Sequence, residues 1–169
     1  YVTGNTVIDA LFATVKSAYR FSEPQLNNID YEGKRILLMT THRRENLGDP
    51  LRSVYKALRM VLELYPDVEI VFPVHKNPGV AGIAHEELSG QERVHLIEPL
   101  DYEPFVNLMQ RSYCVLTDSG GLQEEAPALG KPVLVLRRTT ERPEAVRAGT
   151  VRIVGTEQEE VFREVRRLL

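Results

Sequence analysis

The sequence has only one cysteine, Cys114, among its 169 residues. A single cysteine excludes an intrachain disulfide and any metal site built from several thiolates. Because Cys114 stands within an apolar run, we expect a buried thiol without a chemical role. The chain also lacks an HExxH motif and a His-x-His pair, so neither a metal site nor a metal cofactor is expected.

Long apolar runs and a basic excess are also missing. No window approaches the roughly 18 apolar residues of a membrane span, and residues 1–5 lack the basic start of a signal peptide. We therefore expect a cytoplasmic protein without a membrane partner. The net charge of −3 argues against a nucleic-acid partner, which usually requires a basic surface. The small clusters Arg43-Arg44 and Arg137-Arg138 suit a small anion better than a polymer.

The remaining composition, 43% hydrophobic and 27% charged, is typical of one globular domain. Apolar runs alternate with helical patterns, and a polar segment containing Pro24 and Gly33 reads as a linker. The expected strands are residues 35–41, 68–74, 94–97, 113–117, 132–136 and 151–154. The expected helices are residues 5–20, 49–64, a short helix ending at residue 88, 101–109, a helix after Gly121, 141–148 and 157–169. Asp49 and Asp101 are expected to cap the helices that they begin.

Short apolar strands alternating with helices predict an α/β fold, in which a parallel sheet is covered on both faces. Right-handed crossovers make this a doubly wound, Rossmann-like sheet of six strands. If the strand order is 3-2-1-4-5-6, the first and fourth strands are neighbours where the winding reverses. Ligands of such sheets bind outside the carboxyl ends of those two strands.

The fourth expected strand leads into residues 118–125, with the sequence DSGGLQEE. Strand, glycine turn and helix is an arrangement that aims unpaired backbone N–H groups at a phosphate. Gly120 and Gly121 would let the backbone turn sharply and approach a ligand closely. Glu124 or Glu125 could then accept hydrogen bonds from sugar hydroxyls. The alternative is a capped helix after a tight turn.

The first expected strand leads into residues 41–46, with the sequence THRREN. His42 has a side chain that titrates near neutral pH, which suits acid–base work or the stabilisation of a departing phosphate. The alternative is a histidine that only hydrogen-bonds its loop. His75 follows the second strand, next to the first, and is expected to border the same ligand-binding crevice at the carboxyl ends of the strands. His85 and His95 are expected at the surface.

The fifth expected strand leads into residues 137–144, with the sequence RRTTERPE. Its arginines could reach a diphosphate through charge-assisted hydrogen bonds. Arg142, just before Pro143 at a helix start, is the better ligand candidate, and Arg137 and Arg138 could equally belong to a solvated loop. No GxGxxG follows a strand, so a nicotinamide cofactor is not expected.

These loops together resemble one family. The ordered motifs are THRRENLG (41–48), VHKNP (74–78), DSGGLQEEAP (118–127), LGKPV (129–133) and TTERPEA (139–145). They are similar to those of the non-hydrolysing UDP-N-acetylglucosamine 2-epimerases, enzymes with two Rossmann-like domains in the GT-B arrangement. Residues 2–5 resemble the family's passage between its domains. The resemblance implies that residues 1–22 are an interdomain helix and that 23–169 are a UDP-binding domain, shortened at its C-terminus.

The resemblance also implies roles for single residues. His42 is the candidate catalytic histidine near the departing phosphate. The substrate-binding positions are Leu100 (through its backbone) and Phe105 at the uracil, Ser119, Gly120 and Gly121 at the diphosphate, Glu125 at the ribose and Arg142 against the nucleotide-sugar. Arg43 and His75 match positions that hold a second, regulatory UDP-N-acetylglucosamine in bacterial members.

The implied reaction interconverts UDP-GlcNAc and UDP-ManNAc by elimination and re-addition of UDP, without a cofactor. Family members are about twice this length and are expected to form homodimers. The first domain supplies the carboxylates that move the C2 proton, so the chain is expected to be inactive alone. Two alternatives stay open, a hydrolysing epimerase that releases ManNAc and a UDP-sugar-binding module without activity.

Overall fold

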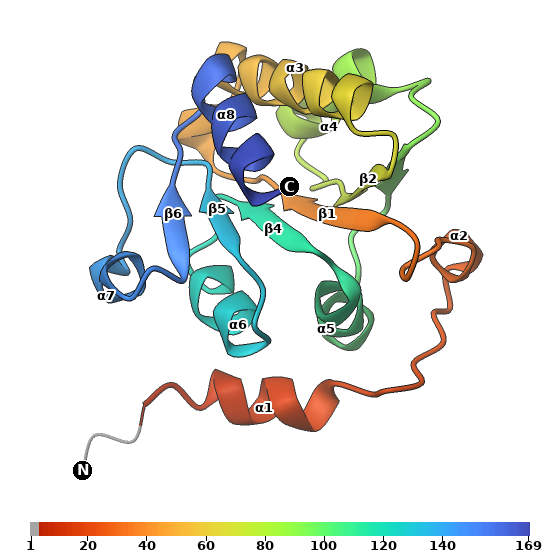
Figure 1. Ribbon diagram of the computed structural model, residues 1–169, viewed down its shortest axis with the longest axis vertical. Coiled ribbons are helices and arrows are strands. Elements are labelled where there is room, and N and C mark those ends of the chain that lie inside the picture. The colour runs from red at the N-terminus through yellow and green to blue at the C-terminus, as the bar shows by residue number, and fades with distance from the viewer. Residues whose placement is uncertain (1–3) are drawn as a thin grey trace.

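The computed structural model describes residues 4–169, so the Val2-Thr3 part of the expected interdomain passage lies outside the described residues. Within residues 4–169, a six-stranded parallel sheet lies between two layers of helices (Figure 1). The strand order is β3-β2-β1-β4-β5-β6. The predicted doubly wound sheet, its strand order and its switch point between the first and fourth strands are therefore confirmed.

The elements follow the predicted alternation closely, with strand ends that differ by at most a residue. The strands are β1 (Arg35–Thr40), β2 (Val68–Pro73), β3 (Val94–Ile97), β4 (Cys114–Thr117), β5 (Val133–Val135) and β6 (Val151–Ile153). The helices are α1 (Val7–Thr14), α2 (Pro24–Asn27), α3 (Asp49–Leu64), α4 (Pro78–Leu88), α5 (Tyr102–Arg111), α6 (Leu122–Ala128), α7 (Pro143–Arg147) and α8 (Gln158–Leu168), with a 3-10 turn η1 (Arg44–Asn46).

The strands are apolar throughout because helices cover both faces of the sheet. Leu37 and Met39 of β1 point into the core under α3, α4 and α8, whereas Ile36 and Leu38 point into the opposite core. Figure 1 shows α5 and α6 on this second side, with α1 crossing beneath them. Cys114 is fully buried, as predicted, and burial raises the pKa of its thiol to about 12.

The first helix is shorter than the predicted residues 5–20, because a tertiary contact ends it. The buried amide of Asn107 on α5 accepts a hydrogen bond from Lys16 N at 2.8 Å and donates one to Thr14 O at 3.2 Å. These bonds replace the helical bonds that would continue α1. The chain then passes through a turn at residues 17–18 and reaches Phe21, whose ring lies edge-on to Tyr19 at 5.1 Å between centroids.

The segment predicted as a linker is packed rather than loose. It contains the single turn α2, with Pro24 at its first position, and buries Leu26 and Ile29 in the core. The Asn27 side chain bonds both the N–H and the carbonyl of Phe21, at 2.9 and 2.8 Å. These contacts tie the segment to the domain.

The helix starts correct one predicted cap, Asp49, and confirm the position of the other, Asp101. The cap of α3 is Gly48, with φ 84°, and Asp49 stands inside the first turn. Glycine takes this left-handed backbone conformation without strain. Asp101 does occupy the cap position of α5, but its side chain makes no capping hydrogen bond. Asn77 caps α4, accepting a hydrogen bond from Gly79 N at 2.9 Å.

Candidate active site at the carboxyl ends of β1 and β4

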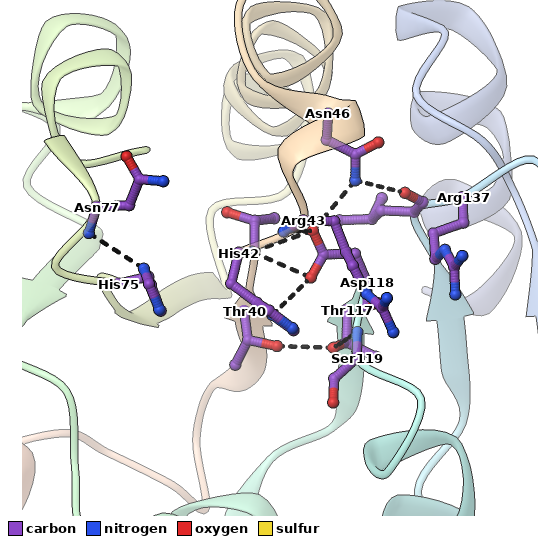
Figure 2. A network of polar contacts seen from close by, with 12 residues as sticks. Thr40, His42, Arg43, Asn46, His75, Asn77, Thr117, Asp118, Ser119 and Arg137 are labelled. Carbon is purple, nitrogen blue, oxygen red and sulfur yellow. Dashed lines mark hydrogen bonds and ion pairs between the residues drawn. The ribbon is translucent and has the colours of Figure 1, made fainter. Parts of the chain in front are cut away.

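The loops after β1 and β4 meet at the switch point, and Asp118 joins them (Figure 2). Its fully buried carboxylate accepts hydrogen bonds from His42 N at 3.0 and 3.1 Å and from Arg43 N at 2.9 Å. It also accepts one from Asn46 Nδ2 at 3.1 Å. Asp118 therefore fixes the backbone of the loop that carries the histidine.

The carboxylate of Asp118 is held ionised. Burial by itself raises its pKa, but the hydrogen bonds from the His42 side chain and from the backbone of Arg43 and His42 outweigh burial, so the pKa lies below its ordinary value. Hydrogen bonds to the charged form of a carboxyl always act in this direction. A buried negative charge therefore stands directly behind His42.

The imidazole of His42 is oriented by this carboxylate. Its Nδ1 lies 2.9 Å from Asp118 Oδ1, and 39% of the side chain is exposed. Because a carboxylate only accepts, Nδ1 carries a proton, and Nε2 is left to face other groups. The ring of His75 lies 6.0 Å away between centroids, and Asn77 N donates to His75 Nδ1 at 3.1 Å. The two predicted histidines thus lie near each other, in the loops that follow β1 and β2.

The Ser-Gly-Gly turn begins directly beyond Asp118. Thr117 Oγ1 accepts a hydrogen bond from Ser119 N at 2.9 Å and bonds Thr40 Oγ1 at 2.7 Å across the strands (Figure 2). Among the described glycines, Gly120 and Gly121 are not in the left-handed region. A turn does form at Gly120 and Gly121, although it does not use a backbone conformation reserved for glycine. Close approach of a ligand stays a prediction.

Three further predicted ligand positions lie on α6 and around the start of α5. Glu125 is buried and accepts a hydrogen bond from Tyr102 Oη at 3.0 Å. Leu100 and Phe105, both half-buried, lie at the start of the same α5 region. Burial, followed by the bond to Glu125, raises the pKa of Tyr102. The tyrosine hydroxyl therefore stays protonated and can donate to the glutamate.

Arg142 is held by Glu124 on α6. Its Nε donates to Glu124 Oε1, and Asn5 Nδ2 donates to Glu124 Oε2 at 2.8 Å. The hydrogen bonds from Asn5 and then Arg142 lower the pKa of Glu124. Glu124 thus connects the start of the described chain to the loop after β5.

The arginines of that loop take different roles. Arg137 is buried and bonds Glu45 Oε1 at 2.9 Å and Glu141 at 2.7 and 2.8 Å, which makes it a structural residue. Arg138 is exposed. Arg43 bonds Asp118 O through Nε at 3.3 Å, and its Nη2 lies 3.9 Å from Glu141.

The two remaining histidines differ in their surroundings. His85 is exposed, as predicted, and lines a cavity together with His75. His95 is not a surface residue, because its Nε2 lies 2.7 Å from Glu69 Oε2 on the neighbouring strand and both side chains are largely covered. Among residues 4–169, no three side chains of the metal-binding types are grouped so that they could hold an ion. No helix of this part of the chain is long and apolar enough to cross a bilayer.

Comparison with known proteins names the family. A family model described as UDP-N-acetylglucosamine 2-epimerase matches residues 1–169. The chain belongs to this family. A UDP-N-acetylglucosamine 2-epimerase of Bacillus subtilis (strain 168) is 50% identical over 169 residues, which are 100% of this chain and 43% of that protein.

Solved structures agree with this assignment. A structure described as S. aureus MnaA with UDP is 47% identical, with a TM-score of 0.91 over 98% of this chain and 44% of that chain. The UDP-GlcNAc 2-epimerase from Neisseria meningitidis bound to UDP-GlcNAc is 45% identical, with a TM-score of 0.89 over 98% of this chain and 46% of that chain. The epimerase-family chain thus spans less than half the length of the relatives that it matches.

Three buried polar residues of this epimerase-family site were not among the predicted site residues. Asp118, Asn46 and Gln123 each make hydrogen bonds to distant parts of the sequence, and these bonds hold the loops after β1, β4 and β5. A signal was present for Asp118, since an aspartate directly after an apolar strand and beside a predicted ligand turn is expected to be buried. No local pattern distinguishes Asn46 or Gln123 from surface amides.

Proposed function

We propose that this chain is the UDP-binding half of a non-hydrolysing UDP-N-acetylglucosamine 2-epimerase, which interconverts UDP-GlcNAc and UDP-ManNAc. The observation that carries the proposal is the His42–Asp118 pair beside the Ser-Gly-Gly turn, at the switch point of the sheet. Two solved relatives, named as complexes with UDP and with UDP-GlcNAc, support this choice of ligand.

In the proposed complex, the diphosphate lies against Ser119, Gly120 and Gly121 at the start of α6, where backbone N–H groups favour an anion. Glu125 accepts hydrogen bonds from the ribose hydroxyls, and its bond from Tyr102 keeps it oriented. The remaining proposed contacts are the Leu100 backbone and Phe105 at the uracil, and Arg142 at the nucleotide-sugar.

His42 is the proposed catalytic residue of this half. In the elimination, the C2 proton leaves to a base, the C2 electrons form the C1–C2 double bond, and the C1–O bond breaks. Its electron pair then remains on the departing phosphate oxygen of UDP. A protonated His42, stabilised by Asp118 behind it, supports that developing charge from Nε2. Re-addition of UDP with proton return from the opposite face gives the epimer.

The base that moves the C2 proton is proposed to come from the other domain. The carboxylates nearest the crevice are engaged: Asp118 with the His42 loop, Glu124 with Arg142, and Glu125 with Tyr102. We therefore propose the domain division expected from the sequence, with residues 1–22 leading in from a first GT-B domain and 23–169 binding UDP.

Three further expectations stay predictions. Arg43 and His75 are proposed to hold a second, regulatory UDP-GlcNAc. In support, Arg43 lies in the loop that Asp118 holds, and the His75 ring lies 6.0 Å from the His42 ring between centroids. The complete enzyme is expected to be a homodimer. Its location is expected to be cytoplasmic.

Three experiments test the proposed function. Titration of this chain with UDP in a calorimeter is expected to give saturable heat, and no heat at millimolar UDP would contradict an autonomous UDP site. Incubation with UDP-GlcNAc, followed by NMR, is expected to show no UDP-ManNAc, and steady turnover would contradict the proposed need for the other domain. With the complete enzyme, UDP-ManNAc is expected, and release of free ManNAc would instead indicate a hydrolysing epimerase.

A further inference from the structure

Gln123 is a fully buried amide in the second position of α6, and both ends of its side chain are bonded. Nε2 donates to Ser119 O at 3.1 Å, and Oε1 accepts the hydroxyl of Thr140. A backbone carbonyl only accepts hydrogen bonds, so the atom facing Ser119 must be the nitrogen. The amide orientation therefore follows from chemistry.

The bond to Ser119 acts on the Ser-Gly-Gly turn through the geometry of the peptide unit. In a planar trans peptide, the carbonyl of one residue and the N–H of the next point in opposite directions. Because Gln123 draws the Ser119 carbonyl inward, the N–H of Gly120 is turned away from the protein interior. This is the direction in which a donor to a bound anion is needed.

The other end of Gln123 acts on the loop after β5. The Thr140 hydroxyl, which donates to Gln123, accepts a hydrogen bond from Arg142 N at 3.0 Å. One buried side chain thus links the turn after β4 to the backbone of Arg142, although the segments are far apart in sequence.

We propose that Gln123 is a positioning residue that sets the Ser-Gly-Gly turn and the Thr140–Arg142 segment relative to each other for binding a nucleoside diphosphate. The inference rests on the proposed UDP site. Gln123 has no exposed surface with which to touch the nucleotide, so it acts through Gly120 and Arg142. Glutamate cannot replace it, because a carboxylate has no proton to donate to Ser119 O.

The test compares Gln123→Met with a matched control, Gln91→Met, at a half-buried glutamine before β3. UDP and uridine are titrated into each ¹⁵N-labelled chain and followed by NMR. For Gln123→Met we expect UDP binding to weaken about tenfold, as for the loss of one well-placed hydrogen bond to a charged group. Uridine binding should stay unchanged, because uridine lacks the diphosphate. Gln91→Met should alter neither.

Amide hydrogen exchange gives a readout that needs no nucleotide. Once Thr140 loses its acceptor, the Arg142 amide should exchange faster in Gln123→Met than in Gln91→Met, while amides of β1 and β4 keep their protection. If Gln123→Met does not fold, Thr140→Val removes one arm of the same link from a partly exposed position. It is expected to speed exchange at Arg142 and weaken UDP binding.

Each outcome decides the proposal. If Gln123→Met weakens the binding of UDP and of uridine equally, the role of Gln123 is merely structural and the proposal is overturned. An unchanged UDP affinity of this variant would also overturn the proposal. If the unmodified chain does not bind UDP, the proposed UDP site fails, and exchange at Arg142 alone decides. Faster exchange then supports the positioning role, and unchanged exchange overturns it.

Discussion

At the scale of single residues, hydrogen-bond donors occupy all the acceptor positions of the Asp118 carboxylate. The Nδ1 and backbone N–H groups of His42, Arg43 N and Asn46 Nδ2 all point at its two oxygens. A carboxylate accepts about four hydrogen bonds, so Asp118 has no capacity left to act as a base toward a substrate. Its role is to hold the backbone of the His42 loop and to stabilise a positive charge on the His42 ring.

Replacing Asp118 with asparagine is therefore expected to destabilise the fold. The new amide presents N–H donors to backbone N–H groups, and we expect a loss of roughly 2–4 kcal/mol of unfolding free energy. Urea denaturation of the purified variant measures it. Asp101→Asn is the matched control, because the Asp101 side chain makes no capping hydrogen bond. An equal loss in both variants would contradict the role assigned to Asp118.

Asp118 also predicts how stability depends on pH. Its pKa is lower in the folded protein than the ordinary 3.8 that it has in the unfolded chain. The stability that it contributes is thus fully present above about pH 4 and is lost as the pH falls through the folded pKa. Urea denaturation between about pH 5 and pH 3 should show a shallower fall for Asp118→Asn than for the unmodified chain. Parallel curves would refute this account.

At the scale of elements, local pattern and tertiary contact disagree at α1. The apolar spacing of residues 5–20 favours a long helix, but Asn107 ends it after Thr14. The Asn107 amide also donates to Glu103 O at 2.9 Å within α5. This one side chain therefore decides that α1 ends at Thr14 and that the backbone becomes extended at Val15.

Removing that amide tests its control of the helix end. Asn107→Ala loses the bonds to Lys16 N, Thr14 O and Glu103 O in a buried position, and we expect a cost of about 2–3 kcal/mol. Hydrogen exchange at the Lys16 amide should accelerate more than at α3 amides. Asn28→Ala, at an exposed asparagine, is the control. Unchanged protection of Lys16 would show that Asn107 does not hold the helix end.

At the scale of the whole molecule, sequence predicts those features that depend on patterns within a segment. The apolar runs predict the strands, and chirality and winding rules then place His42 beside the Ser-Gly-Gly turn, as observed. Asn107 and Gln123 were not foreseen, because their partners lie far away in sequence or in other loops. Such contacts form only after the fold has assembled, so no local spacing encodes them.

Binding at the switch point should stabilise the entire domain, because its loops extend from the central strands β1 and β4. A ligand that binds only the folded state adds about 2.7 kcal/mol at a concentration of 100 times its Kd. For a chain of this size, that is a rise in Tm of roughly 5–10 °C. Thermal unfolding with increasing UDP measures it. Arg142→Ala, which removes a proposed ligand contact, is expected to show a smaller rise at the same UDP concentration. Saturable UDP heat without any rise in Tm would mean that UDP binds folded and unfolded chains alike, which no site built from these loops could do.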